Sequence, residues 1–143
     1  MAIAALTNGA LSAMGLNPPD TEVWPAFAPP GYAIGAIWVA LFGLMGAARW
    51  LVVRERGASA VLNGRAIVVL VGLCLAYPFY THVVGGHAVE LAGNIVTFAV
   101  AAVIAARLRR QRLAAAFVGA VAVWIGFATV LVVALVTLNG WRT

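Results

Sequence analysis

The sequence has few charged residues, no lysine and only one cysteine. Charged side chains make up 9% of its 143 residues, whereas a soluble domain carries roughly a quarter. Too few polar side chains are therefore present to cover a water-facing surface, and the lipid bilayer is the predicted solvent. The single cysteine, Cys74, excludes an intramolecular disulfide, and we interpret it as a small apolar packing residue.

All nine basic residues are arginines, and most of them stand between long apolar runs. A pI near 10.7 is also typical of nucleic-acid-binding proteins. These clusters, however, are short and flanked by segments of membrane length, so positive-inside topology explains them better. We predict no nucleic-acid partner. The two groups are Arg49, Arg54, Arg56 and Arg65, and Arg107, Arg109, Arg110 and Arg112.

Long apolar runs dominate the rest of the chain. A transmembrane helix needs about 20 apolar residues, and a segment in lipid must pair its backbone groups internally. The runs do not alternate polar and apolar residues as a barrel strand does. The sequence therefore predicts one all-α domain over residues 1–143, an integral membrane helix bundle in contact with lipid. Its full spans are residues 32–53, 66–84, 87–106 and 113–138.

The amino-terminal residues 1–16 are mildly apolar and too short for a comfortable span. They lack a basic region, so we predict a short first helix or an interfacial segment and no signal peptide. The arginine-bearing loops 54–65 and 107–112 are predicted to face the cytoplasm. Loop 17–31, which carries Asp20 and Glu22, is predicted to lie outside.

Small residues recur at helical spacing along the spans, as at Gly35, Gly43 and Ala47. In lipid, close backbone approach through small residues drives helix packing. The pattern fits a compact bundle, and it also fits a homodimer face. The spacing does not choose between the two.

The stretch "WPAFAPPGYAIGAIW", residues 24–38, differs from the rest of the chain. Pro29 and Pro30 fit the start of a helix, where the missing N–H costs nothing. An interfacial aromatic belt explains Trp24 and Tyr32. It explains Trp38 less well, because that residue lies well inside the span. An aromatic loop over the bundle mouth is the alternative, as a lid for a flat apolar ligand.

Three blocks of this sequence resemble the TspO/MBR family, the translocator protein and tryptophan-rich sensory proteins. The first block is the stretch at residues 24–38 together with "ALFGLMGAARWLV" shortly after it, and it is similar to the family's second-helix signature. "LAYPFY" at residues 75–80 is similar to its third-helix segment, and "VWIGFATVL" at residues 123–131 to its fifth. The residues that carry the resemblance are Pro25, Pro29, Pro30, Tyr32, Trp38, Leu41, Phe42, Met45, Pro78, Tyr80, Trp124, Phe127, Ala128 and Leu131.

The resemblance implies a five-helix bundle, often dimeric, with a pocket beneath the first loop. Residues 1–16 would be the last turns of the family's first helix. The pocket is expected to bind a hydrophobic small molecule, such as a tetrapyrrole (protoporphyrin IX or haem), as ligand and not as a required cofactor. Binding, transport or sensing of that ligand is the expected function. The ligand-binding residues that it implies are Phe27, Pro29, Pro30, Tyr32, Trp38, Trp124 and Phe127.

Several positions depart from the family pattern. Phe27 stands where the family often has a loop tryptophan, and Ala120 and Val121 stand where it often has Pro-Tyr. Leu73 and Ala76 replace an asparagine and a tryptophan of the third helix. The pocket is therefore expected to be less polar and less aromatic. Porphyrin degradation, reported for some members, is weakened as an expectation by the change at Phe27.

Polar residues near the turn at 83–87 give little support for chemistry. His82 and His87 flank a Gly-Gly turn, which is not ligand spacing on one helix face, so solvated histidines are expected rather than haem ligands. Glu90 suits the first turn of its helix. Asn94 and Thr97 are expected to bond a neighbouring helix.

No catalytic or metal site follows from the spacing of residues. The alternative function is a structural or accessory membrane subunit without a pocket, which packs against partner helices through its small-residue faces.

Overall fold

The computed structural model describes residues 23–55 and 57–141. In these ranges the regular structure is entirely helical, with four helices long and apolar enough to cross a membrane. They are α2 (Gly31–Arg54), α3 (Ala58–Val84), α4 (His87–Arg107) and α5 (Arg112–Asn139). The predicted all-α membrane bundle with four full spans is confirmed. The predicted helix over residues 1–16 lies outside the described residues, as does loop 17–31 before residue 23.

Helix α3 begins at Ala58 rather than at Ala66, where the apolar run starts. Gly57 precedes it with φ +143°, a conformation that glycine adopts far more readily than other residues. The helix then runs through Arg65, whose exposed side chain costs nothing at a membrane surface. Arg65 interrupts the apolar run but not the helix. The apolar pattern therefore predicted the start of α3 too far along the chain.

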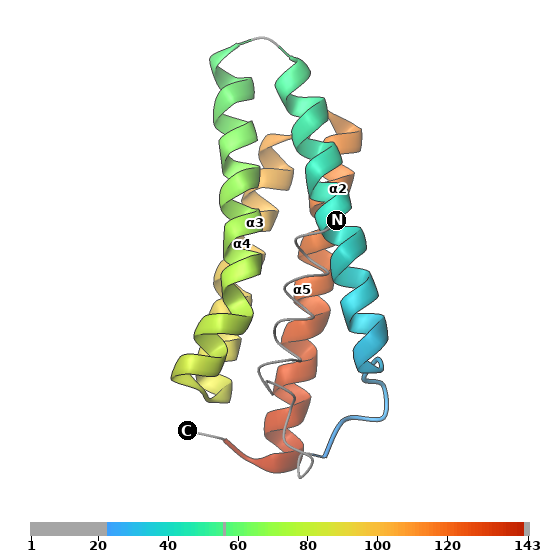
Figure 1. Ribbon diagram of the computed structural model, residues 1–143, viewed down its shortest axis with the longest axis vertical. Helices are drawn as coiled ribbons and strands as arrows, with labels where there is room; N and C mark the ends of the chain where they lie inside the picture. Colours follow the sequence, from blue (N-terminus) through green and yellow to red (C-terminus); the bar gives the residue numbers. More distant parts are fainter. Residues whose placement is uncertain (1–22, 56, 142–143) are drawn as a thin grey trace.

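The helices run antiparallel to their sequence neighbours and close into a ring (Figure 1). Contacts join α2 to α3, α3 to α4, α4 to α5 and α5 back to α2. At one end lie residues 54–55, 57–58 and 107–112, which we call the arginine end. There the Gln111 side-chain amide donates to the Glu55 carboxylate, which ties the two connections together. At the opposite end, the aromatic end, lie residues 23–30, 84–87 and 139–141.

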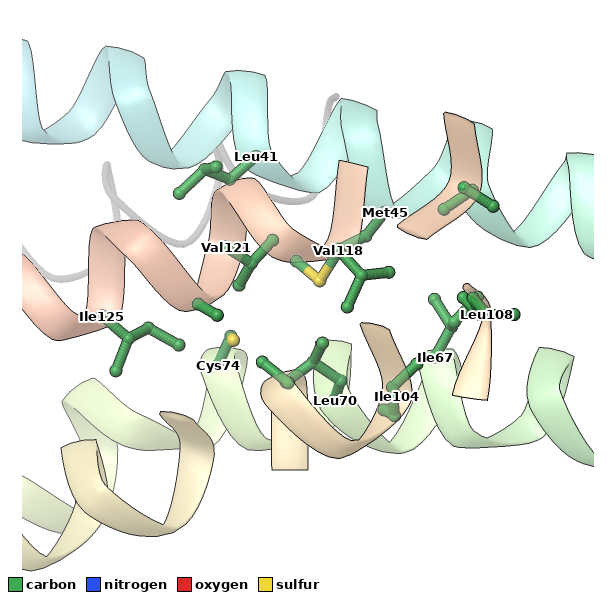
Figure 2. Packing of buried hydrophobic residues seen from close by; sticks show 14 of the residues in the cluster. Leu41, Met45, Ile67, Leu70, Cys74, Ile104, Leu108, Val118, Val121 and Ile125 are labelled. Atoms are coloured by element: carbon green, nitrogen blue, oxygen red, sulfur yellow. The ribbon is translucent and has the colours of Figure 1, made fainter. Parts of the chain in front are cut away.

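The core runs along the axis of the bundle and takes side chains from every helix (Figure 2). Met45, Ile67 and Leu70 are fully buried in it. The helices also approach closely, because a Cβ at Gly64 of α3 would lie 3.0 Å from a methyl group of Val53 on α2. Because lipid tails are as apolar as the core, such close packing is what holds the spans together.

Candidate ligand-binding site

The segment 23–30 is hydrogen-bonded to the side chain of Asn139, the last residue of α5. The Asn139 side-chain oxygen accepts a hydrogen bond from the Val23 backbone N–H at 2.9 Å. Its side-chain nitrogen donates to the Val23 carbonyl at 3.0 Å and to the Leu135 carbonyl at 3.1 Å. Asn139 therefore pairs both backbone groups of Val23, as a neighbouring strand would, and holds this residue against the end of α5.

Prolines fix the other end of the segment. Pro30 precedes the first residue of α2 with φ −63° and ψ 149°, and its carbonyl accepts from the Ala33 N–H at 2.8 Å. Pro29 is half-buried and Pro30 is exposed. Upstream, Pro25 is buried, and its carbonyl accepts from the Ala28 N–H at 2.9 Å in a tight turn. The prolines thus start the helix, as their positions predicted.

Three aromatic rings join this segment to α5. Phe27 meets Phe127 edge to face, with ring centroids 6.2 Å apart and planes 75° apart. Phe127 in turn stacks on Trp124, at 5.4 Å and 27°. We call Phe27, Trp124 and Phe127 the aromatic cluster. Each such pair adds about 0.5–1.5 kcal/mol beyond its buried area, although Phe27 itself remains 53% exposed.

The other aromatic residues implied by the resemblance lie elsewhere. Trp38 pairs with Phe42 on its own helix, with centroids 5.7 Å apart, and packs half-buried against the core. Tyr32 is 83% exposed, which suits an interfacial residue better than a pocket wall. The structure therefore brings together Phe27, Trp124 and Phe127, and does not bring Tyr32 to them.

A group of polar residues lies between α3 and α4 at the same end of the bundle. His87 Nδ1 lies 3.3 Å from Glu90 Oε2, and the Tyr77 hydroxyl lies 3.5 Å from the Glu90 carbonyl oxygen, to which it donates. Asn94, one turn further along α4, is buried, and its side-chain nitrogen has no hydrogen-bond partner among the described residues. Thr97 is buried too.

Two sequence expectations about these residues are corrected. His87, the first residue of α4, is only 3% exposed and therefore not solvated. Thr97 donates to Gly93 of its own helix at 2.8 Å rather than to a neighbouring helix. His82, by contrast, is exposed as expected. Among the described residues, no group of three or more His, Cys, Asp or Glu could hold a metal ion.

Gly93 is the residue that lets α3 approach α4 here. A Cβ at this position would overlap the Tyr80 hydroxyl oxygen and lie 3.1 Å from the Tyr77 ring. The two tyrosine rings meet edge to face at 5.6 Å. Sequence reasoning passed over Tyr77. Its spacing of three residues from Tyr80, opposite a small residue in the next helix, was the signal that could have found it.

Comparison with protein-family models matches residues 2–138 to the TspO/MBR family. The chain belongs to the TspO/MBR family. The match extends over nearly the whole chain and includes the four described helices except the last residue of α5. No curated protein and no solved structure matches the chain.

For a TspO/MBR protein, the aromatic cluster holds two of the residues that carried the resemblance, Trp124 and Phe127, beside Phe27, which departs from it. A loop residue and a helix residue far apart in sequence thus meet at one end of the bundle. Tyr80, another of those residues, lies against Gly93 in the polar group. Both features of the aromatic end are therefore built on positions that the family pattern marks.

Proposed function

We propose that this TspO/MBR protein binds a flat apolar ligand, such as the tetrapyrrole protoporphyrin IX, beneath segment 23–30. The observation that carries the proposal is the contact of Phe27 with Phe127, which is itself stacked on Trp124. A macrocycle that enters between segment and helix would replace this ring contact with stacking on its own face. Because the displaced ring is already half-exposed, its movement costs little buried area.

Segment 23–30 is suited to act as a lid. It is held at Val23 by the Asn139 hydrogen bonds and at its junction with α2 by Pro29 and Pro30. Between these points it has no regular structure, so Phe27 moves without disturbing a helix. Trp38, half-buried on α2 next to α5, is proposed as a further ligand contact. Tyr32 is proposed to meet the ligand only at the rim.

Polar groups at this end would accommodate polar substituents of the ligand. The Tyr77 hydroxyl of α3 reaches the Glu90 carbonyl of α4, and the buried Asn94 side-chain nitrogen has no hydrogen-bond partner among the described residues. Buried polar groups that bond a ligand fix its orientation. The arginine end is proposed to face the cytoplasm by the positive-inside rule, which places the lid outside. Whether the bound ligand is carried, sensed or altered depends on steps beyond binding.

The test is quenching of tryptophan fluorescence by protoporphyrin IX in detergent-purified protein. Saturable quenching that weakens in Trp124→Phe and Trp38→Phe is expected. Trp50→Phe is the matched control, because Trp50 lies near the arginine end. There the guanidinium carbon of Arg54 lies 4.4 Å from the centroid of the Trp50 ring. Linear quenching that is equal in all variants would rule out a ligand site at these rings.

A second candidate function is that of an accessory subunit, or a homodimer, packed through α2. Gly43 and Gly46 are exposed on this helix, and a Cβ at either would meet no atom within 4 Å. Such an open small-residue surface fits a closely packed partner helix. A stoichiometric partner that co-purifies with the wild type and is lost in Gly43→Leu, together with no saturable porphyrin quenching, would favour this function.

A further inference from the structure

A groove opens at the arginine end, between the first turns of α3 and the last turns of α4. It lies at the opposite end of the bundle from the aromatic cluster (Figure 1). Neither the proposed ligand nor its lid involves it. Its lining residues are Ser59, Leu62, Asn63, Val103, Ala106, Arg107, Arg109 and Arg110.

The rim of this groove is strongly positive. Arg107, Arg109 and Arg110 are exposed, and within the described residues no carboxylate pairs with them. The described lining itself includes no Asp or Glu. Ser59 and Asn63 add hydrogen-bonding side chains from the α3 side. Three guanidinium groups without counter-charges favour a phosphate, which they bind through charge-assisted and often bidentate hydrogen bonds.

The wall of the groove is apolar on the side toward the membrane. Leu62 is 58% exposed and Val103 57% exposed, and both belong to helices that span the bilayer. Ala106 lies between Val103 and the arginines along α4. The groove therefore offers a charged rim and an apolar wall within a few helical residues of each other, which matches an amphiphile and not a soluble anion.

We propose that this groove binds an anionic glycerophospholipid. The phosphate lies among Arg107, Arg109 and Arg110, and an acyl chain follows Leu62 and Val103 toward the membrane interior. Basic pockets between transmembrane helices recognise such head groups. A free phosphate would gain nothing from the apolar wall, and a zwitterionic lipid would place its own cation among the arginines. The turn at 84–87 joins α3 and α4 at the aromatic end. A bound lipid would hold the two helices together at the opposite, arginine end.

The experiment is native mass spectrometry of protein released from detergent containing phosphatidylglycerol or phosphatidylcholine. The wild type should retain phosphatidylglycerol in preference to phosphatidylcholine. The double variant Arg109→Gln/Arg110→Gln should retain phosphatidylglycerol about tenfold more weakly or worse. The matched control is Arg49→Gln/Arg112→Gln, which removes the same charge near the same end but outside the groove. It should retain the lipid as the wild type does.

Three results would overturn the proposal. Equal loss in both double variants would mean that net charge alone attracts the lipid. Equal retention of both lipids by the wild type would mean that the groove does not select a head group. Displacement of phosphatidylglycerol by millimolar inorganic phosphate would mean that the arginines bind a soluble anion. Unchanged far-ultraviolet circular dichroism confirms that each variant is folded.

Discussion

The side chain of Asn139 hydrogen-bonds both backbone groups of Val23, a residue 116 positions away in the chain. It links Val23, in the non-helical segment 23–30, to the last residue of α5. The ring contact between Phe27 and Phe127 is a second link between the same two elements. These links couple the position of the segment to α5, and they make the lid testable separately from the ligand.

We expect Asn139→Ala to loosen segment 23–30 without unfolding the bundle. The substitution removes the two hydrogen bonds to Val23 and a third to the Leu135 carbonyl. The two to Val23 are exposed, and each is worth about 0.5–1.5 kcal/mol, so local opening of the segment should increase several-fold. Amide hydrogen exchange of a peptide covering residues 23–30 measures that opening. Thr137→Ala is the control, because Thr137 bonds only its own helix at Ala134. Equal exchange in wild type and Asn139→Ala would contradict the role of Asn139.

Phe27→Trp is expected to strengthen porphyrin binding. Phe27 occupies the position where the family often has a loop tryptophan, and it lies half-exposed over Phe127. A larger ring gains stacking area on a macrocycle, and about 1 kcal/mol of added stacking corresponds to a several-fold lower dissociation constant. Absorbance titration of the porphyrin band measures it without relying on tryptophan emission. Phe27→Ala should weaken binding, and unchanged affinity in both variants would remove Phe27 from the site.

Met45→Ala should destabilise the bundle far more than Val123→Ala. Met45 is fully buried in the core, whereas Val123 is 74% exposed. Truncation of a buried methionine typically costs about 2–5 kcal/mol, because the cavity is only partly filled by relaxation. The fall in melting temperature in detergent compares the two variants. If the melting temperature fell equally in both variants, the axis of the bundle would not be its tightly packed core.

The spans could be read from the sequence because each is a run of apolar residues of membrane length. The ends near Pro30 and the turn at 84–87 were also legible, since proline and glycine mark them. The start of α3 was not predicted correctly, because the apolar run begins only after Arg65 whereas the helix begins before it, at Ala58. Hydropathy detects what lipid tolerates, whereas helix ends depend on backbone conformation, here that of Gly57.

Only part of the candidate site could be predicted from the sequence. Family resemblance pointed to Trp124 and Phe127, and the proline-rich segment pointed to Phe27, but no spacing in the sequence predicts that these three meet. Their contact depends on the register of segment 23–30 against α5, which the side chain of Asn139 helps to set. Burial of His87 was missed because no local pattern in the sequence predicts that the first residue of this helix is covered by the rest of the protein.

Gly93→Ala is expected to displace the rings of Tyr80 and Tyr77 and to destabilise the bundle. The new methyl group would overlap the Tyr80 hydroxyl and press on the Tyr77 ring, and such overpacking typically costs about 1–3 kcal/mol. The melting temperature in detergent measures the loss. Gly119→Ala on α5 is the matched control, since a Cβ there meets no atom within 4 Å. Adding Tyr80→Leu to Gly93→Ala should recover part of the loss, because leucine has no atom where the hydroxyl lay. If that double variant were no more stable than Gly93→Ala, the cost would come from something other than contact with Tyr80.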